Sequence, residues 1–224
     1  MSTVFKLNTE KAKAADAPAR INQTGPYLGK FTRAELVTSR QGTQGVDFSF
    51  VAEDGQRADY LTLWTVKKDG TELSGLKVLH ALLACLALRE VASQAGTVRV
   101  WDNEQKKEVD RAAELLPTLM NRPIGVVLQR EEYWPENGNQ KRDRMNLVTV
   151  FQHGTNLMAK EILDRKPTAE ALAKFVPTIK DKLAADRPQR SGGGGGQAGG
   201  YGDQGHAGAG YGGGFDQMDD DIPF

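Results

Sequence analysis

The chain of 224 residues has a single cysteine, only three histidines and no long apolar run. One cysteine can form neither an internal disulfide nor a cysteine-based zinc site, which favours a reducing compartment. The first 19 residues are polar and charged and lack the apolar segment of a secretory signal. The longest apolar run, 78–88, is interrupted by His80 and is far too short to cross a membrane. We therefore expect a soluble, cytoplasmic protein that makes no membrane contact.

Signals for catalysis are also scarce. His80 lies in an apolar segment and His153 follows a predicted strand, and neither is accompanied by a motif for nucleophilic catalysis. Cys85 lies among leucines, as expected of a small buried side chain rather than a nucleophile. The chain has no G-x-x-x-x-G-K-[ST] phosphate loop, and the glycines of 192–196 neither follow a strand nor open a helix. We expect a protein that is not an enzyme and uses no cofactor or metal.

The net charge is zero, but the two signs are separated along the chain. The sequence has 29 Lys and Arg and 29 Asp and Glu. Residues 191–224 contain five of the acids and no Lys or Arg, which leaves residues 1–190 with an excess of five positive charges. The same tail holds 14 of the 25 glycines. A body of ordinary composition, long enough to bury a core, is thus followed by an acidic, Gly-rich tail.

Short β-type runs bounded by turn residues dominate the body. They predict strands over 27–38, 46–53, 58–67, 97–101, 124–133 and 144–152. Leucines at helical spacing predict a largely buried helix over 74–91. Further helices are predicted over 110–120, with Asp110 as N-cap, and over 155–163 and 168–185, with threonine N-caps and a break at Pro177.

Three strands, a helix and two more strands is the order of an OB-fold, a five-stranded barrel with a helix between its third and fourth strands. An open α+β sheet can show the same order and remains an alternative. The predicted fold is mainly β with helical additions. It has a flexible arm over 1–25, an OB-fold core over 26–153 and a helical appendage over 154–187.

The tail predicts a tethered ligand. Residues 188–214 are mostly glycine and cannot bury enough apolar area to fold, so a disordered linker is expected. A flexible chain of about 34 residues spans roughly 30 Å, against a radius of gyration of about 16 Å for the body. The tail can therefore reach any face of its own body or a partner beside it.

The acidic tip, 215–224, has a specific composition. Asp219, Asp220 and Asp221 precede Ile222, Pro223 and Phe224 at the very end of the chain. Three carboxylates beside a compact apolar terminus form a peptide ligand for an apolar pocket with a basic rim. Solubility alone does not call for Ile-Pro-Phe at this position.

A Gly-rich linker that ends in Asp-Asp-Asp-Ile-Pro-Phe resembles the tail of bacterial single-stranded DNA-binding proteins. The resemblance covers about the last 35 residues, and it implies that the tip recruits replication, recombination and repair enzymes and competes with DNA for the binding groove. The body is similar instead to phage-encoded single-stranded DNA-binding proteins, in the Gly25-Pro26-Tyr27 opening and in the segments 73–90 and 123–134. This second resemblance does not favour the tetramer of the bacterial family.

Binding of single strands without sequence preference needs a basic groove and aromatic faces for stacking. Strand alternation predicts that Leu28, Ala34 and Leu36 point inward and that Phe31 and Arg33 point outward, while Phe48 and Phe50 pack in the core. Leu61 and Leu63 form one face of the third strand, and Tyr60 and Trp64 the other. Aromatic residues in strands more often belong to the core, and charge runs are usually solvated faces. The candidate DNA contacts are Phe31, Arg33, Arg40, Tyr60, Trp64, Lys67, Lys68, Trp134, Lys141, Arg142 and Arg144.

The predicted function is a phage-encoded protein that coats and protects single-stranded DNA in the cytoplasm of a bacterial host. Its tip would recruit a helicase, polymerase, primase or exonuclease, and would fold back on the basic groove when DNA is absent. One alternative is a strand-annealing or recombination-mediator protein, and another is a protein-interaction adaptor. Whether the chain forms a homodimer stays open.

Overall fold

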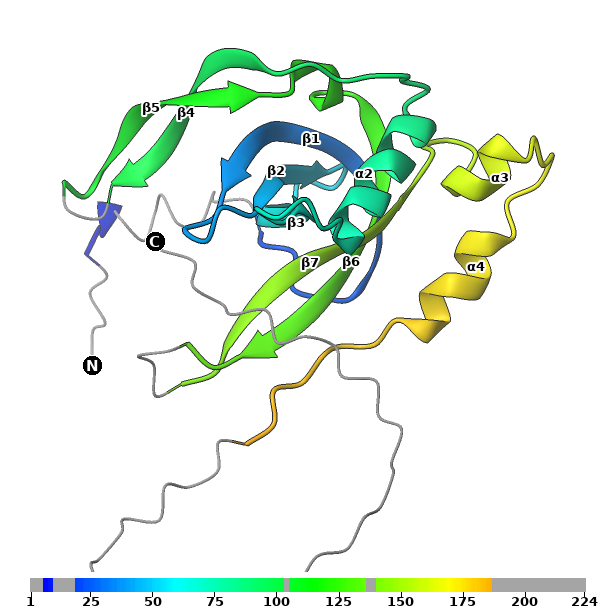
Figure 1. Cartoon of the computed structure of the whole chain (residues 1–224). Coiled ribbons are helices and arrows are strands. Elements are labelled where there is room, and N and C mark those ends of the chain that lie inside the picture. The colour runs from blue at the N-terminus through cyan, green and yellow to red at the C-terminus, as the bar shows by residue number, and fades with distance from the viewer. Residues whose placement is uncertain (1–5, 10–18, 103–104, 136–139, 187–224) are drawn as a thin grey trace, which may run out of the picture. The chain divides into compact units, whose positions relative to one another are not determined.

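The computed structural model describes residues 6–9, 19–102, 105–135 and 140–186 (Figure 1). By its internal contacts the chain divides into two units, Met1–Ala184 and Ala185–Phe224, and every element described below belongs to the first. The predicted linker and the tip, with its six candidate partner-binding residues, lie outside the described residues.

The described part of the chain is mainly β, with a few short helices, as predicted. Its strands are β1 (Gly25–Thr38), β2 (Gln44–Ala52), β3 (Arg57–Val66), β4 (Gln94–Asp102), β5 (Lys107–Leu115), β6 (Pro123–Tyr133) and β7 (Arg142–Phe151). Its helices are α2 (Ser74–Cys85), α3 (Ala159–Leu163) and α4 (Ala171–Phe175), with 3-10 turns η1 (Pro117–Leu119) and η2 (Val176–Thr178).

The strands form an open antiparallel sheet built around β1. Its order is β3-β2-β1-β5-β4, and β6 pairs with β1 and with β7. One edge of β1 pairs with β2 from Gly29 onward, and along the other edge Gly25–Lys30 pair with β6 and Glu35 pairs with β5. β3 contacts β7, but the described residues form no ladder between these two strands. The sheet therefore curls without closing through hydrogen bonds.

The core lies between the inner face of this sheet and α2. Phe31, Phe48 and Phe50 are fully buried, and the rings of Phe31 and Phe48 lie 4.5 Å apart. Helix α2 packs on β3 and β7, and its approach depends on Gly75, where a Cβ would lie 2.3 Å from the carbonyl oxygen of Trp64. Burial of each large apolar side chain stabilises the fold by about 1.5–3 kcal/mol.

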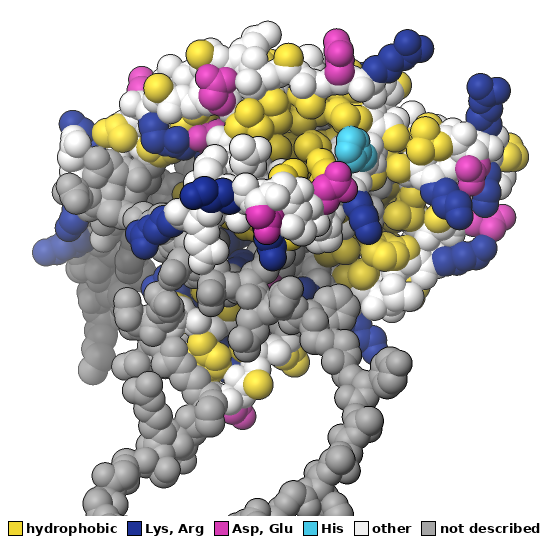
Figure 2. Space-filling view, in the orientation of Figure 1, with side chains coloured by type: hydrophobic (Ala, Val, Ile, Leu, Met, Phe, Trp, Pro, Cys, Tyr) yellow, Lys and Arg dark blue, Asp and Glu magenta, His cyan; other side chains and the backbone are white. Residues whose placement is uncertain are grey.

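Helix α2 is shorter and less buried than predicted. It ends at Cys85 instead of continuing to residue 91, because Ala87 adopts a left-handed conformation with φ of 52°. Cys85 is buried, which raises the pKa of its thiol to about 12. Leu79 and Leu83 of the same helix are only half-buried. Figure 2 shows apolar side chains that remain visible on this side of the molecule.

The helix predicted over 110–120 is wrong. Residues 107–115 form β5, which pairs with β4 through nine residue pairs, and only η1 is helical. The sequence Arg-Ala-Ala-Glu-Leu-Leu favours a helix locally, but the ladder to β4 holds the segment extended. The strand predicted over 97–101 is confirmed as part of β4.

The C-terminal helices differ from the prediction in their ends and caps. Helix α3 begins at Ala159 and α4 at Ala171, and neither uses a threonine side chain as its cap. Buried Glu161 takes that role: it accepts hydrogen bonds from the backbone N–H groups of Glu170, Ala171 and Met158, and these lower the pKa of its carboxyl. The predicted break at Pro177 is confirmed, since η2 replaces α4 there.

Two features are absent from the described ranges. No helix in them has the length and apolarity that a bilayer crossing requires. These same ranges also contain no group of three or more His, Cys, Asp or Glu able to hold a metal ion.

Candidate nucleic-acid interface

The outer face of the sheet is shaped by two β-bulges opposite Ser49. We call outer the face that carries Arg33, Ser49 and Tyr60, away from the core. On one side of β2, Phe31 pairs with Phe50 and Arg33 with Ser49, so that Thr32 is an extra residue in β1. On the other side the register also shifts, and both Asp59 and Tyr60 of β3 lie opposite Ser49. Bulges bend a strand and redirect side chains, and they are enriched beside functional sites.

The bulge in β3 exposes Tyr60. This residue has φ of 60°. It is also 68% exposed, which is unusual for a large aromatic residue in a sheet. A left-handed conformation costs a non-glycine residue about 1–2 kcal/mol, and such strain collects at binding sites. The guanidinium carbon of Arg33 lies 5.8 Å from the ring centroid, within cation–π distance.

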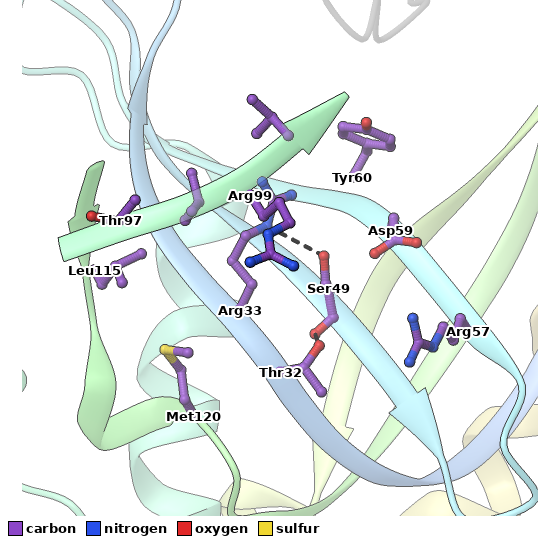
Figure 3. Close-up of a pocket in the computed structure, with 12 residues that line it drawn as sticks. Thr32, Arg33, Ser49, Arg57, Asp59, Tyr60, Thr97, Arg99, Leu115 and Met120 are labelled. Atoms are coloured by element: carbon purple, nitrogen blue, oxygen red, sulfur yellow. Dashed lines mark hydrogen bonds between the residues drawn. The ribbon is translucent and has the colours of Figure 1, made fainter. Parts of the chain in front are cut away.

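The bulged strands form the floor of a cavity of about 410 Å³. Its wall is the β4–β5 hairpin, and Figure 3 shows β4 crossing over the strands that carry Arg33 and Ser49. Arg33, Arg57 and Arg99 line the cavity together with Tyr60, and Figure 3 shows Asp59 between Tyr60 and Arg57. The lining combines an aromatic ring, three cations, one carboxylate and hydroxyl groups, which suits one nucleotide of a flexible strand.

A chain of polar contacts crosses the outer face beneath this cavity. Thr62 donates to Asp47 at 2.7 Å, and Asp47 forms an ion pair with Arg33. Arg33 also pairs with Glu35 at 3.2 Å, and Glu35 accepts from Arg111 of β5 at 2.7 Å. The chain therefore links β3, β2, β1 and β5.

Both carboxylates of this chain are buried. The side chains of Glu35 and Asp47 are 3% and 8% exposed. Burial raises the pKa of the Asp47 carboxyl, although its contacts with Thr62 and Arg33 act in the opposite direction. Together with the backbone bond from Leu116 N to Ala34 O, the Arg111–Glu35 pair attaches the β4–β5 hairpin to β1.

A second group of aromatic and basic side chains lies on the β6–β7 hairpin. Arg144 lies 5.2 Å from the ring of Tyr133, and Lys141 lies 5.6 Å from the ring of Trp134. Arg144 also pairs with Glu131, whose pKa is lowered by hydrogen bonds from Asn146 and Arg144 despite its burial. Aromatic rings backed by cations in this way are suited to stacking with bases.

The segment that follows α4 is held against this hairpin. Lys182 N donates to Arg130 O, and Glu132 N donates to Lys182 O, so the chain runs beside β6. Asp181 pairs with Arg130 at 3.2 Å, and Lys141 Nζ donates to Ala184 O at 2.8 Å. The first unit of the chain thus ends beside the aromatic and basic side chains of β6–β7.

Three further basic candidates meet at one end of the sheet, whereas Arg142 is the first residue of β7. Lys67 and Lys68 lie in the turn after β3, and Arg40 lies in the turn after β1. These turns touch, since a Cβ on Gly42 would lie 3.1 Å from Cδ of Lys68. All three cations are exposed.

No family model and no curated protein matches the chain. The assignment of a function therefore rests on the sequence pattern and on the geometry of these surfaces.

The prediction that Phe31 contacts DNA from the outer face is wrong. Phe31 is fully buried against Phe48 and Phe50 instead of lying on the outer face. The cause is the bulge: with Thr32 as an extra residue, Phe31 and Ala34 both point inward, and regular alternation no longer applies. Leu36, predicted to point inward, is 42% exposed.

The other predicted contacts lie at the surface or half-buried. Tyr60 and Arg33 lie at the cavity, whereas Trp64 is half-buried with its ring over Gly45. Arg57, Arg99 and Arg111 are absent from the predicted contacts. Arg99 and Arg111 lie on the β4–β5 hairpin, whose second strand has the local pattern of a helix. Strong alternation in Thr97-Val98-Arg99-Val100 was the available signal for its first strand.

Proposed function

We propose that the protein binds single-stranded DNA without catalysis, through the outer face of β1–β3 and the β6–β7 hairpin. The observation that carries the proposal is Tyr60, which is exposed and strained and lines a cavity together with Arg57 and Arg99. Bases of a single strand have free faces that can stack on such a ring, and its phosphates need nearby cations.

We further propose that the core is an OB-type fold. The supporting features are the β1-β2-β3 meander, a helix after β3, the β6–β7 pair beside β1, and the contact of β3 with β7. The β4–β5 hairpin is then an insertion between the helix and the fourth strand of the barrel. In this arrangement the β1–β2 turn and the β6–β7 hairpin border the binding face, and these carry Arg40, Lys141 and Arg142.

Titration with poly-dT tests the proposal directly. We expect the nucleic acid to quench tryptophan fluorescence, because Trp134 lies among the cations of the β6–β7 hairpin. Trp134→Phe is expected to remove a larger share of the quenching than Trp64→Phe, since the ring of Trp64 packs over Gly45. A chain that shows neither quenching nor a shift on a native gel would contradict the function and favour the adaptor alternative.

The acidic tip is proposed to recruit partner proteins and to compete with DNA. This part rests on the sequence, on the separation of charge and on the place where the first unit ends, beside Lys141. The linker that the sequence predicts would keep the acids at high local concentration near the basic groups of β6–β7.

Deletion of residues 215–224 is expected to raise DNA affinity about three- to tenfold at low salt, with little effect at high salt, because the competition is electrostatic. Fluorescence anisotropy of a labelled oligonucleotide measures this change. A chain with Ile222→Ser and Phe224→Ser keeps the acids and should bind DNA like the parent. Equal affinity of the parent and the deleted chain at low salt would refute the competition.

A further inference from the structure

The most unexpected feature of the outer face is a pair of buried carboxylates that hold two of its arginines, Arg33 and Arg111. Glu35 and Asp47 are 2% and 6% exposed as whole residues. A negative charge beneath a surface that binds phosphates opposes binding. Their burial also costs desolvation energy that is offset only by close counter-ions. A role in fold stability alone would be served as well by apolar side chains of similar volume.

The two carboxylates engage the two arginines nearest to the centre of the face. Arg33 binds both of them and Ser49, which leaves its side chain 18% exposed. Arg111 binds Glu35 at 2.7 Å with a side chain 49% exposed. Two cations and two anions cancel, so the strip from β3 to β5 is electrically neutral, whereas Arg57 and Arg99 line the cavity above it.

A neutral strip affects duplex and single strands differently. A duplex hides the faces of its bases, so a protein that does not read its grooves holds it mainly through phosphates, and the affinity follows the number of available cations. A single strand has free bases and gains about 1–3 kcal/mol from each base that stacks on an aromatic ring. The strip thus withholds cations on which a duplex depends for most of its affinity, whereas a single strand depends on them less because it keeps the stacking at Tyr60.

We propose that Glu35 and Asp47 are specificity-determining residues, which disfavour duplex DNA by holding Arg33 and Arg111 away from phosphates. The proposal rests on the proposed binding of single-stranded DNA at this face. It assigns Arg33 a positioning role beneath Tyr60 rather than a direct contact with DNA.

Glu35→Gln in the full-length chain tests the proposal. The change removes the negative charge and keeps the shape, which frees Arg111 for a phosphate. We expect affinity for a duplex to rise about tenfold at low salt, with a salt slope steeper by about one unit, whereas affinity for a single strand of equal length changes less than about threefold. Anisotropy titrations of both substrates over a range of salt concentrations provide the measurement.

The matched control is Glu114→Gln, which makes the same change of charge at an exposed position of β5. We expect it to leave the ratio of duplex to single-strand affinity unchanged. Asp47→Asn is a second variant for which we expect the same change, and its amide oxygen can still accept the hydrogen bond from Thr62. It replaces Glu35→Gln if circular dichroism shows that Glu35→Gln does not fold.

The outcomes separate the two proposals. If the parent chain does not bind single strands, the proposed function fails. If the parent prefers single strands but Glu35→Gln and Asp47→Asn behave like Glu114→Gln, only the role of the carboxylates is overturned. An increased ratio of duplex to single-strand affinity in either variant, but not in the control, supports it.

Discussion

Tyr60→Ala is expected to lower affinity for single-stranded DNA about 10- to 100-fold, because removal of one stacking platform costs about 1–3 kcal/mol. Tyr60 is 68% exposed and lines the same cavity as Arg57 and Arg99. Anisotropy of a labelled oligo-dT at moderate salt measures the loss. Tyr60→Phe keeps the ring and should bind within about threefold of the parent.

The backbone of the same residue gives a second readout. Because φ is 60° at Tyr60, glycine fits this position better than alanine. Tyr60→Gly is therefore expected to be more stable than Tyr60→Ala by about 1 kcal/mol in urea unfolding, although both lose the same binding. If Tyr60→Ala bound single-stranded DNA within twofold of the parent, Tyr60 would be excluded as the main stacking platform, and the interface would be assigned to the β6–β7 hairpin.

Phe31→Ala is expected to reduce the free energy of unfolding by about 3–5 kcal/mol, the range for truncation of a buried aromatic side chain. Phe31 is fully buried, and its ring contacts those of Phe48 and Phe50 at 4.5 and 5.7 Å. Urea denaturation followed by circular dichroism measures the loss.

A surface position provides the comparison. Leu163 is 73% exposed, and Leu163→Ala should change stability by less than about 0.5 kcal/mol. If Phe31→Ala were as stable as the parent but lost DNA binding, Phe31 would instead belong to the interface, as strand alternation predicts.

Tyr60 and Phe31 also show how much of the fold could be predicted from the sequence. Alternation correctly places Leu61, Leu63, Phe48 and Phe50 inside and Tyr60 outside. It fails at Phe31, because a bulge depends on the hydrogen bonds of the neighbouring strand, and a single strand's pattern does not contain that information.

The β4–β5 hairpin shows a second limit. Residues 110–115 have good helix formers and no strong alternation of apolar and polar side chains, so local propensity predicts a helix. Their pairing with β4 decides otherwise. The cavity was beyond prediction for the same reason: Arg57 and Arg99 are 42 positions apart in the sequence, and only the fold of the hairpin brings both to one cavity. Aromatic and basic candidates that lie within one strand or turn, such as Tyr60 or Lys67, need no such long-range information.

The paired bulges also restrict how the chain can change in length. Thr32 in β1 and one residue of the Asp59–Tyr60 pair in β3 have no counterpart in β2. Deletion of Thr32 would leave Phe31 and Ala34 two positions apart, so that regular alternation keeps both in the core, but it would remove the bulge from β1. Loss of the odd residue therefore removes the bulge without exposing the core, whereas any other single insertion or deletion within β1 would reverse the side chains beyond it.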